Sequence, residues 1–132
     1  MFKRTPWKKY NSTITEIDWI KFKSKIEARF YQYFKENNIE IEEMQPWFLL
    51  QEKFRFEWEA IRELKYIADF IINYNWYRII IEVKGFKTPE FMIKKKLFLA
   101  KLLNWRIAEP KIKYMICKSI KDFEEQIRLL NK

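Results

Sequence analysis

The sequence contains no histidine, one cysteine and one glycine. The lack of histidine and the solitary Cys117 exclude Cys/His zinc sites, a disulfide framework and catalysis by histidine. No apolar run approaches the roughly 20 residues that span a bilayer, so we expect no membrane segment. The basic N-terminus leads into no apolar stretch, so we expect no secretory signal. A reducing, cytoplasmic setting fits, in the host cytoplasm if the protein is viral.

Basic residues outnumber acidic ones in this chain. There are 27 Lys and Arg against 18 Asp and Glu, which gives a net charge of +9. Such an excess in a small domain favours phosphate-rich partners, chiefly nucleic acid. A composition rich in Lys, Ile and Asn, as an AT-rich genome encodes, explains the same excess without such a partner. The 48% of hydrophobic residues predicts a folded chain over most of its length.

The chain divides into a basic arm, residues 1–13, and a single domain, residues 14–132. Ser24 stands three residues before Glu27, the spacing of a capping box, and predicts a helix that ends at about Glu36. Apolar patterning predicts the remaining elements. We expect a strand or hairpin within 14–22, strands at 39–43, 53–58, 65–73, 77–85 and 111–117, and helices at 89–103 and 120–130; 59–64 is a helical turn or a loop. This order predicts an α/β or α+β domain with one mixed sheet.

The strands at 65–73 and 77–85 predict a hairpin whose register can be derived. If its short loop is symmetric, paired residue numbers add up to 151, which places Asp69 directly opposite Glu82 on one face. A slip of one residue would put the two carboxylates on opposite faces. Gly85 follows, and we expect it to allow a sharp turn or the close approach of another backbone.

Two facing carboxylates in an apolar sheet repel each other, and burying their charges is costly. A cation is therefore expected between or beside them. Lys84, two residues beyond Glu82 on the same face, can form a structural salt bridge. Alternatively, a divalent ion binds there, and oxygen ligands without His or Cys suit Mg²⁺ or Mn²⁺.

Asp69, followed by Glu82-Val83-Lys84 at the end of a hydrophobic strand, resembles the signature of the PD-(D/E)XK nuclease superfamily, with Ala68 in place of the usual proline. Glu27 in the first predicted helix matches the acid of that family's first helix. The segments IKFKSKIEARFYQ, QPWF, YIADF, IEVKGFKT and IKKKLFLAKL also resemble small phage-encoded endonucleases of this superfamily, over about residues 14–104. The resemblance implies a restriction-endonuclease-like core of order αβββαβ, with a central mixed sheet flanked by helices.

The resemblance also implies an activity, Mg²⁺-dependent hydrolysis of DNA phosphodiester bonds, with Mn²⁺ as a substitute. Asp69, Glu82 and Glu27 would be metal ligands, and Lys84 would contact the attacking water or a phosphate oxygen. As the partner of Ser24, however, Glu27 is also fully explained as a helix cap. Within the superfamily we expect a phage or mobile-element enzyme that resolves branched DNA such as Holliday junctions, as a homodimer without a small-molecule cofactor.

Two basic clusters are candidate DNA contacts: Lys94, Lys95 and Lys96 after the site, and Lys3 and Arg4 on the arm. A solvated helical face explains the lysine triplet equally well. Two other functions stay open on the sequence alone. One is a non-catalytic DNA-binding protein in which the acids and Lys84 form an ion-pair cluster, and the other is a restriction-like or exonuclease activity on duplex DNA.

Overall fold

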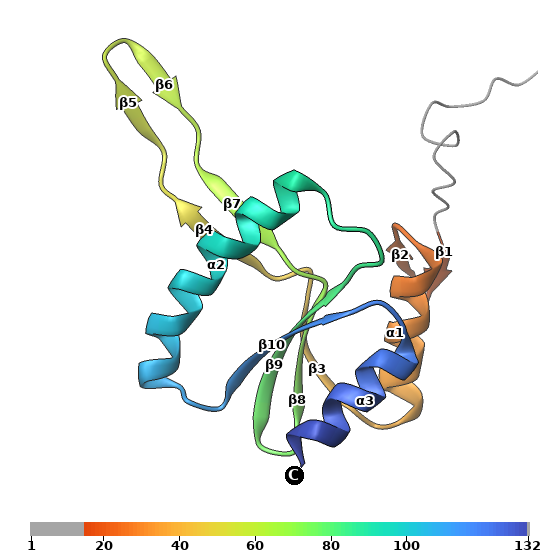
Figure 1. Ribbon diagram of the computed structural model, residues 1–132. Helices are drawn as coiled ribbons and strands as arrows, with labels where there is room; N and C mark the ends of the chain where they lie inside the picture. The colour runs from red at the N-terminus through yellow and green to blue at the C-terminus, as the bar shows by residue number, and fades with distance from the viewer. Residues whose placement is uncertain (1–14, 132) are drawn as a thin grey trace, which may run out of the picture.

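The computed structural model describes residues 15–131, and the predicted basic arm with Lys3 and Arg4 lies outside this range. Figure 1 shows the arrangement of the elements. In chain order they are β1 (Thr15–Ile17), β2 (Ile20–Phe22), α1 (Lys25–Glu36), β3 (Glu40–Met44), β4 (Trp47–Gln51), β5 (Phe54–Phe56), β6 (Glu59–Ile61), β7 (Leu64–Ile67), β8 (Phe70–Tyr74), β9 (Tyr77–Val83), α2 (Pro89–Ala108), β10 (Ile112–Cys117) and α3 (Ile120–Leu130).

A four-stranded mixed sheet forms the centre of the fold, with strand order β10-β9-β8-β3. β9 pairs antiparallel with β8 and parallel with β10, and β3 pairs antiparallel with β8 at the edge. In Figure 1, α2 lies on one side of this sheet, and α1 and α3 lie on the other. The predicted α+β class with a central mixed sheet is confirmed.

Hydrophobic side chains alternate between the two faces of the sheet and build two cores. Ile79 and Ile81 of β9 pack with Phe30 and Phe34 of α1 and with Phe123 of α3. Ile80 of β9 packs in the second core, which contains Phe91, Phe98 and Leu102 of α2. The continuous isoleucine run of β9 is therefore explained, because both faces of a strand covered by helices must be apolar.

Side-chain caps begin the helices where the sequence predicts them. The hydroxyls of Ser24, Thr88 and Ser119 accept hydrogen bonds from backbone N–H groups in the first turns of α1, α2 and α3. Each of these bonds satisfies a donor that has no partner within the helix. α2 runs to Ala108, beyond its predicted end at Leu103.

Four expectations about the strands need correction. The 65–73 run is not one strand, because it breaks at Ala68-Asp69 into β7, which pairs with β4, and β8 of the central sheet. Residues 59–64 form neither a helical turn nor a loop alone, since 59–61 is strand β6. The alternation of aromatic and charged residues predicts a half-exposed strand at 53–58, but β5 and β6 form a hairpin that projects from the body (Figure 1), and its side chains are mostly exposed. The two-stranded pairs β1-β2, β4-β7 and β5-β6 supplement the predicted single sheet.

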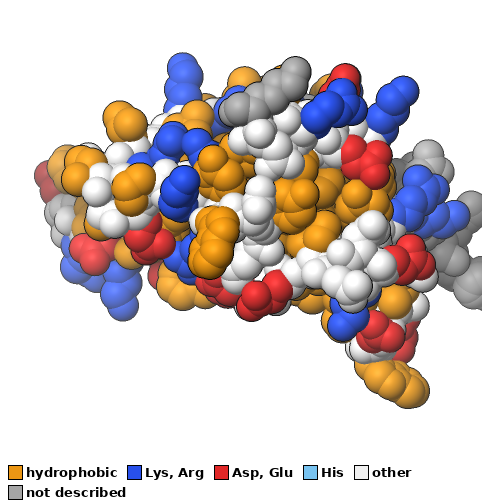
Figure 2. Space-filling view, turned by 90° about the horizontal axis from the view of Figure 1, so that it is seen from below, with side chains coloured by type: hydrophobic (Ala, Val, Ile, Leu, Met, Phe, Trp, Pro, Cys, Tyr) orange, Lys and Arg blue, Asp and Glu red, His pale blue; other side chains and the backbone are white. Residues whose placement is uncertain are grey.

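Many large hydrophobic side chains remain exposed at the surface. They include Phe56 and Trp58 in the β5–β6 hairpin and Leu103 and Ile107 of α2. Figure 2, seen from below, shows hydrophobic side chains among charged ones at the left-hand end, where α2 and this hairpin lie in Figure 1. None of the helices within 15–131 combines the length and the apolar character needed to cross a membrane.

Candidate functional site

The hairpin of β8 and β9 has the predicted register. Its two turn residues, Asn75 and Trp76, have φ values of 51° and 75°, as a two-residue type I′ turn requires. The strand pairs run from Tyr74 with Tyr77 to Phe70 with Ile81, so paired numbers add up to 151. The turn therefore fixes which residues of the two strands share a face.

Asp69 lies one position beyond the last pair of this ladder. Its N–H donates to the carbonyl of Ile81 at 3.0 Å, one residue away from the predicted partner, Glu82. Its carboxylate oxygen Oδ2 accepts the N–H of Val83 at 2.6 Å. The break between β7 and β8 thus brings the Asp69 side chain to the end of β9. The prediction that Asp69 pairs directly with Glu82 is therefore corrected: Asp69 contacts the backbone of Ile81 and Val83, the residues on either side of Glu82.

The pKa of the Asp69 carboxyl is raised from 3.8 to about 8. Burial is the main cause, and the negative charges of Glu82 and Glu27 add to it, while the Val83 hydrogen bond and the charge of Lys84 oppose it. At neutral pH the protein on its own therefore holds Asp69 largely protonated. A nearby cation would return it to the charged form.

Glu82 is 6% exposed and is the one charged residue within 15–131 that is fully buried. Its Oε1 accepts a hydrogen bond of 2.5 Å from the Tyr66 hydroxyl, and its Oε2 lies 4.0 Å from Nζ of Lys84. Burial raises the pKa of Glu82, although Tyr66 and Lys84 both favour its charged form. Tyr66 is in turn 2.8 Å from the hydroxyl of Tyr114.

Tyr66 is a site residue that the sequence did not single out. It belongs to β7, which the sequence merges with β8, and its contact with Glu82 depends on where β7 crosses the end of β9. The only signal was a tyrosine next to the apolar pair Ile67-Ala68, before Asp69. A buried tyrosine requires a polar partner for its hydroxyl, and the nearest buried acid supplies one here.

Glu27 joins the same group from the first turn of α1. Its N–H donates to Oγ of Ser24 at 3.3 Å, and its Oε2 accepts from that hydroxyl at 3.2 Å, so Ser24 caps α1 with Glu27 as its partner. Burial raises the pKa of Glu27. Its charge also raises the pKa values of Asp69 and Glu82, and Lys84 lowers all three. The four residues that the sequence predicts as a site thus act on one another electrostatically at one end of the central sheet.

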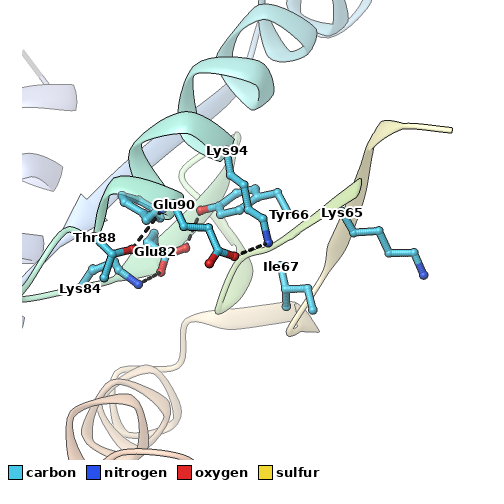
Figure 3. A pocket seen from close by; sticks show the side chains of 9 residues that line it. Lys65, Tyr66, Ile67, Glu82, Lys84, Thr88, Glu90 and Lys94 are labelled. Atoms are coloured by element: carbon cyan, nitrogen blue, oxygen red, sulfur yellow. Dashed lines mark hydrogen bonds and ion pairs between the residues drawn. The ribbon is translucent and has the colours of Figure 1, made fainter. Parts of the chain in front are cut away.

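A pocket of about 270 Å³ opens beside Glu82 and is drawn in Figure 3. Three lysines line this pocket: Lys84, which is paired with Glu82, Lys94, and Lys65, whose ammonium group lies over the ring of Trp47. Lys94 forms an ion pair with Glu90 at 3.2 Å. The remaining lining residues are Tyr66, Ile67, Thr88, Glu90 and Phe91. Of the predicted lysine triplet, only Lys94 lines this pocket, because successive residues of a helix point in directions about 100° apart, so Lys95 and the exposed Lys96 point elsewhere.

The donor set can be compared with the needs of a hard divalent cation. Glu82 supplies buried and Asp69 partly buried carboxylate oxygens whose charged forms lack full compensation, which suits Mg²⁺. Within 15–131, however, no three His, Cys, Asp or Glu side chains are grouped closely enough to hold a metal ion. Glu27, held by Ser24, would have to turn toward the other two acids to complete such a group. The chemistry of the donors fits the ion, with Asp69 and Glu82 as the matching pair.

The chain bends at Gly85 as the sequence suggests, but within 15–131 no other backbone approaches it closely. It has no positive φ, and a Cβ placed on it would meet nothing within 4 Å. The fold therefore does not require glycine at this position. Gly85 instead lines a second, open pocket next to the first, together with Lys84, Phe86, Lys87, Ile116, Lys118, Asp122 and Gln126.

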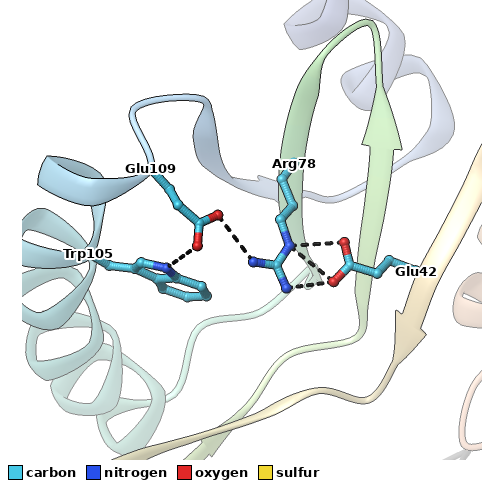
Figure 4. Close-up of polar contacts among 4 residues, drawn as sticks. All are labelled: Glu42, Arg78, Trp105 and Glu109. Carbon is cyan, nitrogen blue, oxygen red and sulfur yellow. Dashed lines mark hydrogen bonds and ion pairs between the residues drawn. The ribbon is translucent and has the colours of Figure 1, made fainter.

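A second polar cluster, shown in Figure 4, lies at the other end of β9. Arg78 donates to both carboxylate oxygens of Glu42, with Nε at 2.9 and 3.0 Å, and its Nη1 lies 3.4 Å from Glu109. Glu109 also accepts from the indole of Trp105 at 3.0 Å. Glu42 sits at the bulge of β3, so the cluster links β3, β9 and the end of α2. The cluster has a structural role, because it joins these three elements, and it lies at the opposite end of β9 from Glu82.

The chain belongs to the family described as "Protein of unknown function (DUF1064)", whose sequence profile matches residues 7–124. That stretch includes Glu27, Asp69, Glu82 and Lys84. Comparisons with curated proteins and with solved structures gave no match.

Proposed function

We propose that this protein is a Mg²⁺-dependent nuclease that hydrolyses phosphodiester bonds in DNA. The observation that carries the proposal is the convergence of Asp69, Glu82 and Lys84 where β9 ends. Two acids with raised pKa values and a lysine stand there beside a pocket lined by further lysines. The core order α1-β3-β8-β9-α2-β10 supports it, since it follows the αβββαβ pattern of the nuclease superfamily that the sequence resembles.

Asp69 and Glu82 would hold the metal ion, and Glu27 would assist them. When bound, the ion would lower the pKa of a water molecule and polarise the scissile phosphate. Tyr66 fixes the orientation of Glu82 through its short hydrogen bond. Lys84 carries its ammonium group to the pocket, where it would donate to a phosphate oxygen as negative charge develops.

The substrate we propose is branched DNA such as a four-way junction, cleaved internally in the cytoplasm of a phage-infected cell or of a cell that carries a mobile element. The net charge of +9 and the lysines around the pocket favour a polyanion. Lys94 is the best placed of the predicted DNA contacts, because it reaches the pocket mouth from α2.

A second candidate function is a DNA-binding protein without catalysis. It is favoured by the internal partner that each acid already has: Val83 N–H for Asp69, Tyr66 and Lys84 for Glu82, and Ser24 for Glu27. In this case the acids and Lys84 would stabilise the fold and no metal would be required.

Incubation with labelled four-way junction, flap and linear duplex DNA, in Mg²⁺ or in EDTA, separates these functions. We expect Mg²⁺-dependent cuts in the junction, abolished by Asp69→Asn and by Glu82→Gln. Lys121→Ala is the matched control, since this exposed lysine on α3 lies outside the pocket. Binding of all substrates without cleavage under Mg²⁺ or Mn²⁺ would establish the non-catalytic alternative. Cleavage of linear duplex ends alone would indicate an exonuclease.

A further inference from the structure

α2 has two apolar faces, but the body of the protein covers only one. Its inner face, with Phe91, Phe98 and Leu102, is buried in the core. The opposite side also carries large hydrophobic residues, and Leu103 is 69% and Ile107 81% exposed. A helix that is hydrophobic on all sides is normally buried on all sides. We call residues Ile93, Lys96, Ala100, Leu103 and Ile107 the outer seam of α2.

The spacing of the outer seam is that of a helix–helix contact. Its positions alternate steps of three and four residues, the a/d repeat through which helices pack along a common seam. Met92, Leu97 and Leu99 widen it on both sides, and each is at least 39% exposed. Lys96 is the single charged residue in the seam, so the surface is unsuited to a polyanion. An apolar helix is the partner that this spacing fits.

We propose that the outer seam binds the outer seam of a second copy of the chain, with the two α2 helices antiparallel about a two-fold axis beside Ala100. Ile93 of one copy would then lie next to Ile107 of the other. Ala100 is the smallest residue of the seam and stands at its middle, where two crossing helices approach most closely.

Lys96 distinguishes the antiparallel arrangement from the parallel one. In a parallel pair the two Lys96 ammonium groups would face each other across the seam and repel. In the antiparallel pair they lie at opposite ends, each beside Asn104 of the other copy. Antiparallel packing also places opposite ends of the two helix dipoles together. The repulsion between the Lys96 side chains and the interaction of the helix dipoles thus both favour the antiparallel arrangement.

The β5–β6 hairpin supplies further apolar area for such a dimer. One helical face of this length covers less than the roughly 800 Å² per partner that a stable complex buries. Phe54, Phe56 and Trp58 of the hairpin are 47%, 62% and 83% exposed. The hairpin extends from β4 and β7, the strands on which α2 packs, and projects away from the body in Figure 1.

Sedimentation of the full chain tests the association. We expect a dimer, and roughly tenfold or weaker association for Ile107→Glu and Leu103→Glu. Leu129→Glu and Trp76→Glu, exposed apolar residues on other elements, are matched controls that should remain dimeric. Thermal unfolding should show all four variants folded, since the substituted side chains are exposed. A wild-type chain that stays monomeric at about 100 μM would overturn the proposal, and so would dimers that survive both seam variants.

Cross-linking through cysteine tests the register. In a Cys117→Ser background, which removes the buried native thiol, Ala100→Cys should cross-link to itself. Ile93→Cys should cross-link only when mixed with Ile107→Cys. Self-cross-linking of Ile93→Cys and of Ile107→Cys separately would show a parallel pair and overturn the proposal, as would the absence of any cross-link. These outcomes do not depend on whether the protein cleaves DNA.

Discussion

The most unusual residues of this protein are two acids, Asp69 and Glu82, whose negative charges the surrounding residues do not fully compensate. Asp69 and Glu82 are both held in a setting where burial raises their pKa values, and Lys84 offsets only part of the cost. A folded domain retains such an arrangement when the charged forms have a use or a partner. A divalent cation is the partner that would satisfy both acids at once.

Stability should therefore fall as pH rises. The pKa of Asp69 is about 8 in the folded chain and 3.8 ordinarily, so the unfolded chain loses this proton first and is favoured between those two values. We expect the metal-free protein to lose roughly 1–3 kcal/mol of its free energy of unfolding between pH 5 and pH 8. Denaturant unfolding across this range measures it.

Asp69→Asn is the control for this prediction. The amide oxygen can still accept the Val83 N–H but carries no charge, so the variant should show a flatter pH profile and gain stability at pH 8. Addition of Mg²⁺ should stabilise the wild type at pH 8 and leave the variant unchanged. An equally steep profile in the variant would place the titrating group elsewhere.

Glu27 has a structural and a proposed catalytic role that two substitutions separate. Ser24→Ala removes the cap of α1 and should cost about 1 kcal/mol of stability, with little change in cleavage rate once the protein is folded. Glu27→Gln keeps an oxygen that can accept from Ser24 and should leave stability nearly unchanged. If Glu27 serves the metal site, this variant should cleave at least about tenfold more slowly. If Glu27→Gln and the wild type cleave at equal rates, Glu27 has only its structural role as the partner of Ser24 at the start of α1.

At the scale of elements, local sequence signals were sufficient to predict helix starts and strand register where capping residues or a tight turn set the boundary of an element. Ser24, Thr88 and Ser119 begin helices at the predicted positions, and the Asn75-Trp76 turn fixes the hairpin register. The break at Ala68-Asp69 was not predictable, because an apolar run looks the same whether it pairs with one strand or with two. The same holds for the contact between Tyr66 and Glu82, which exists only once β7 crosses the end of β9.

The mostly exposed β5–β6 hairpin also escaped prediction. Phe54, Phe56 and Trp58 alternate with charged residues, which is the pattern of a strand with one buried face. Among residues 15–131 no layer covers that face. Alternation of apolar and polar residues indicates that a strand has an apolar face. It does not indicate whether that face packs against the same chain or against another one.

Arg78 connects β3, β9 and the end of α2, so its substitution should lower the free energy of unfolding and leave the cleavage rate of the folded protein unchanged. Arg78→Ala deletes the bidentate contact with Glu42 and the contact with Glu109, at the end of β9 away from Glu82. We expect a loss of about 1–2 kcal/mol in thermal or denaturant unfolding. Lys121→Ala, an exposed control on α3, should change stability by less than about 0.5 kcal/mol. A larger loss of cleavage than of stability would contradict the assignment of Arg78 as structural.

At the scale of the whole molecule, the site and the outer seam use different faces of α2. The cap Thr88 and the residues Phe91 and Lys94 of the first turns border the pocket, and the seam runs from Ile93 to Ile107 on the opposite side. In the proposed dimer the two pocket ends of the helices would lie roughly 30 Å apart, from a rise of about 1.5 Å per residue. Two sites on one dimer suit a branched DNA that must be cut in two strands.

The central claim is that Asp69, Glu82 and Lys84 form a metal-dependent phosphodiesterase site. The most direct measurement is the single-turnover cleavage rate of a labelled four-way junction in Mg²⁺, for the wild type, Asp69→Asn, Lys84→Met and the exposed control Lys121→Ala. We expect cleavage by the wild type and Lys121→Ala, none in EDTA, none by Asp69→Asn, and a rate lower by roughly 10²–10³ for Lys84→Met. Equal cleavage by Asp69→Asn and the wild type, or no cleavage by a folded wild type with either Mg²⁺ or Mn²⁺, would contradict the claim.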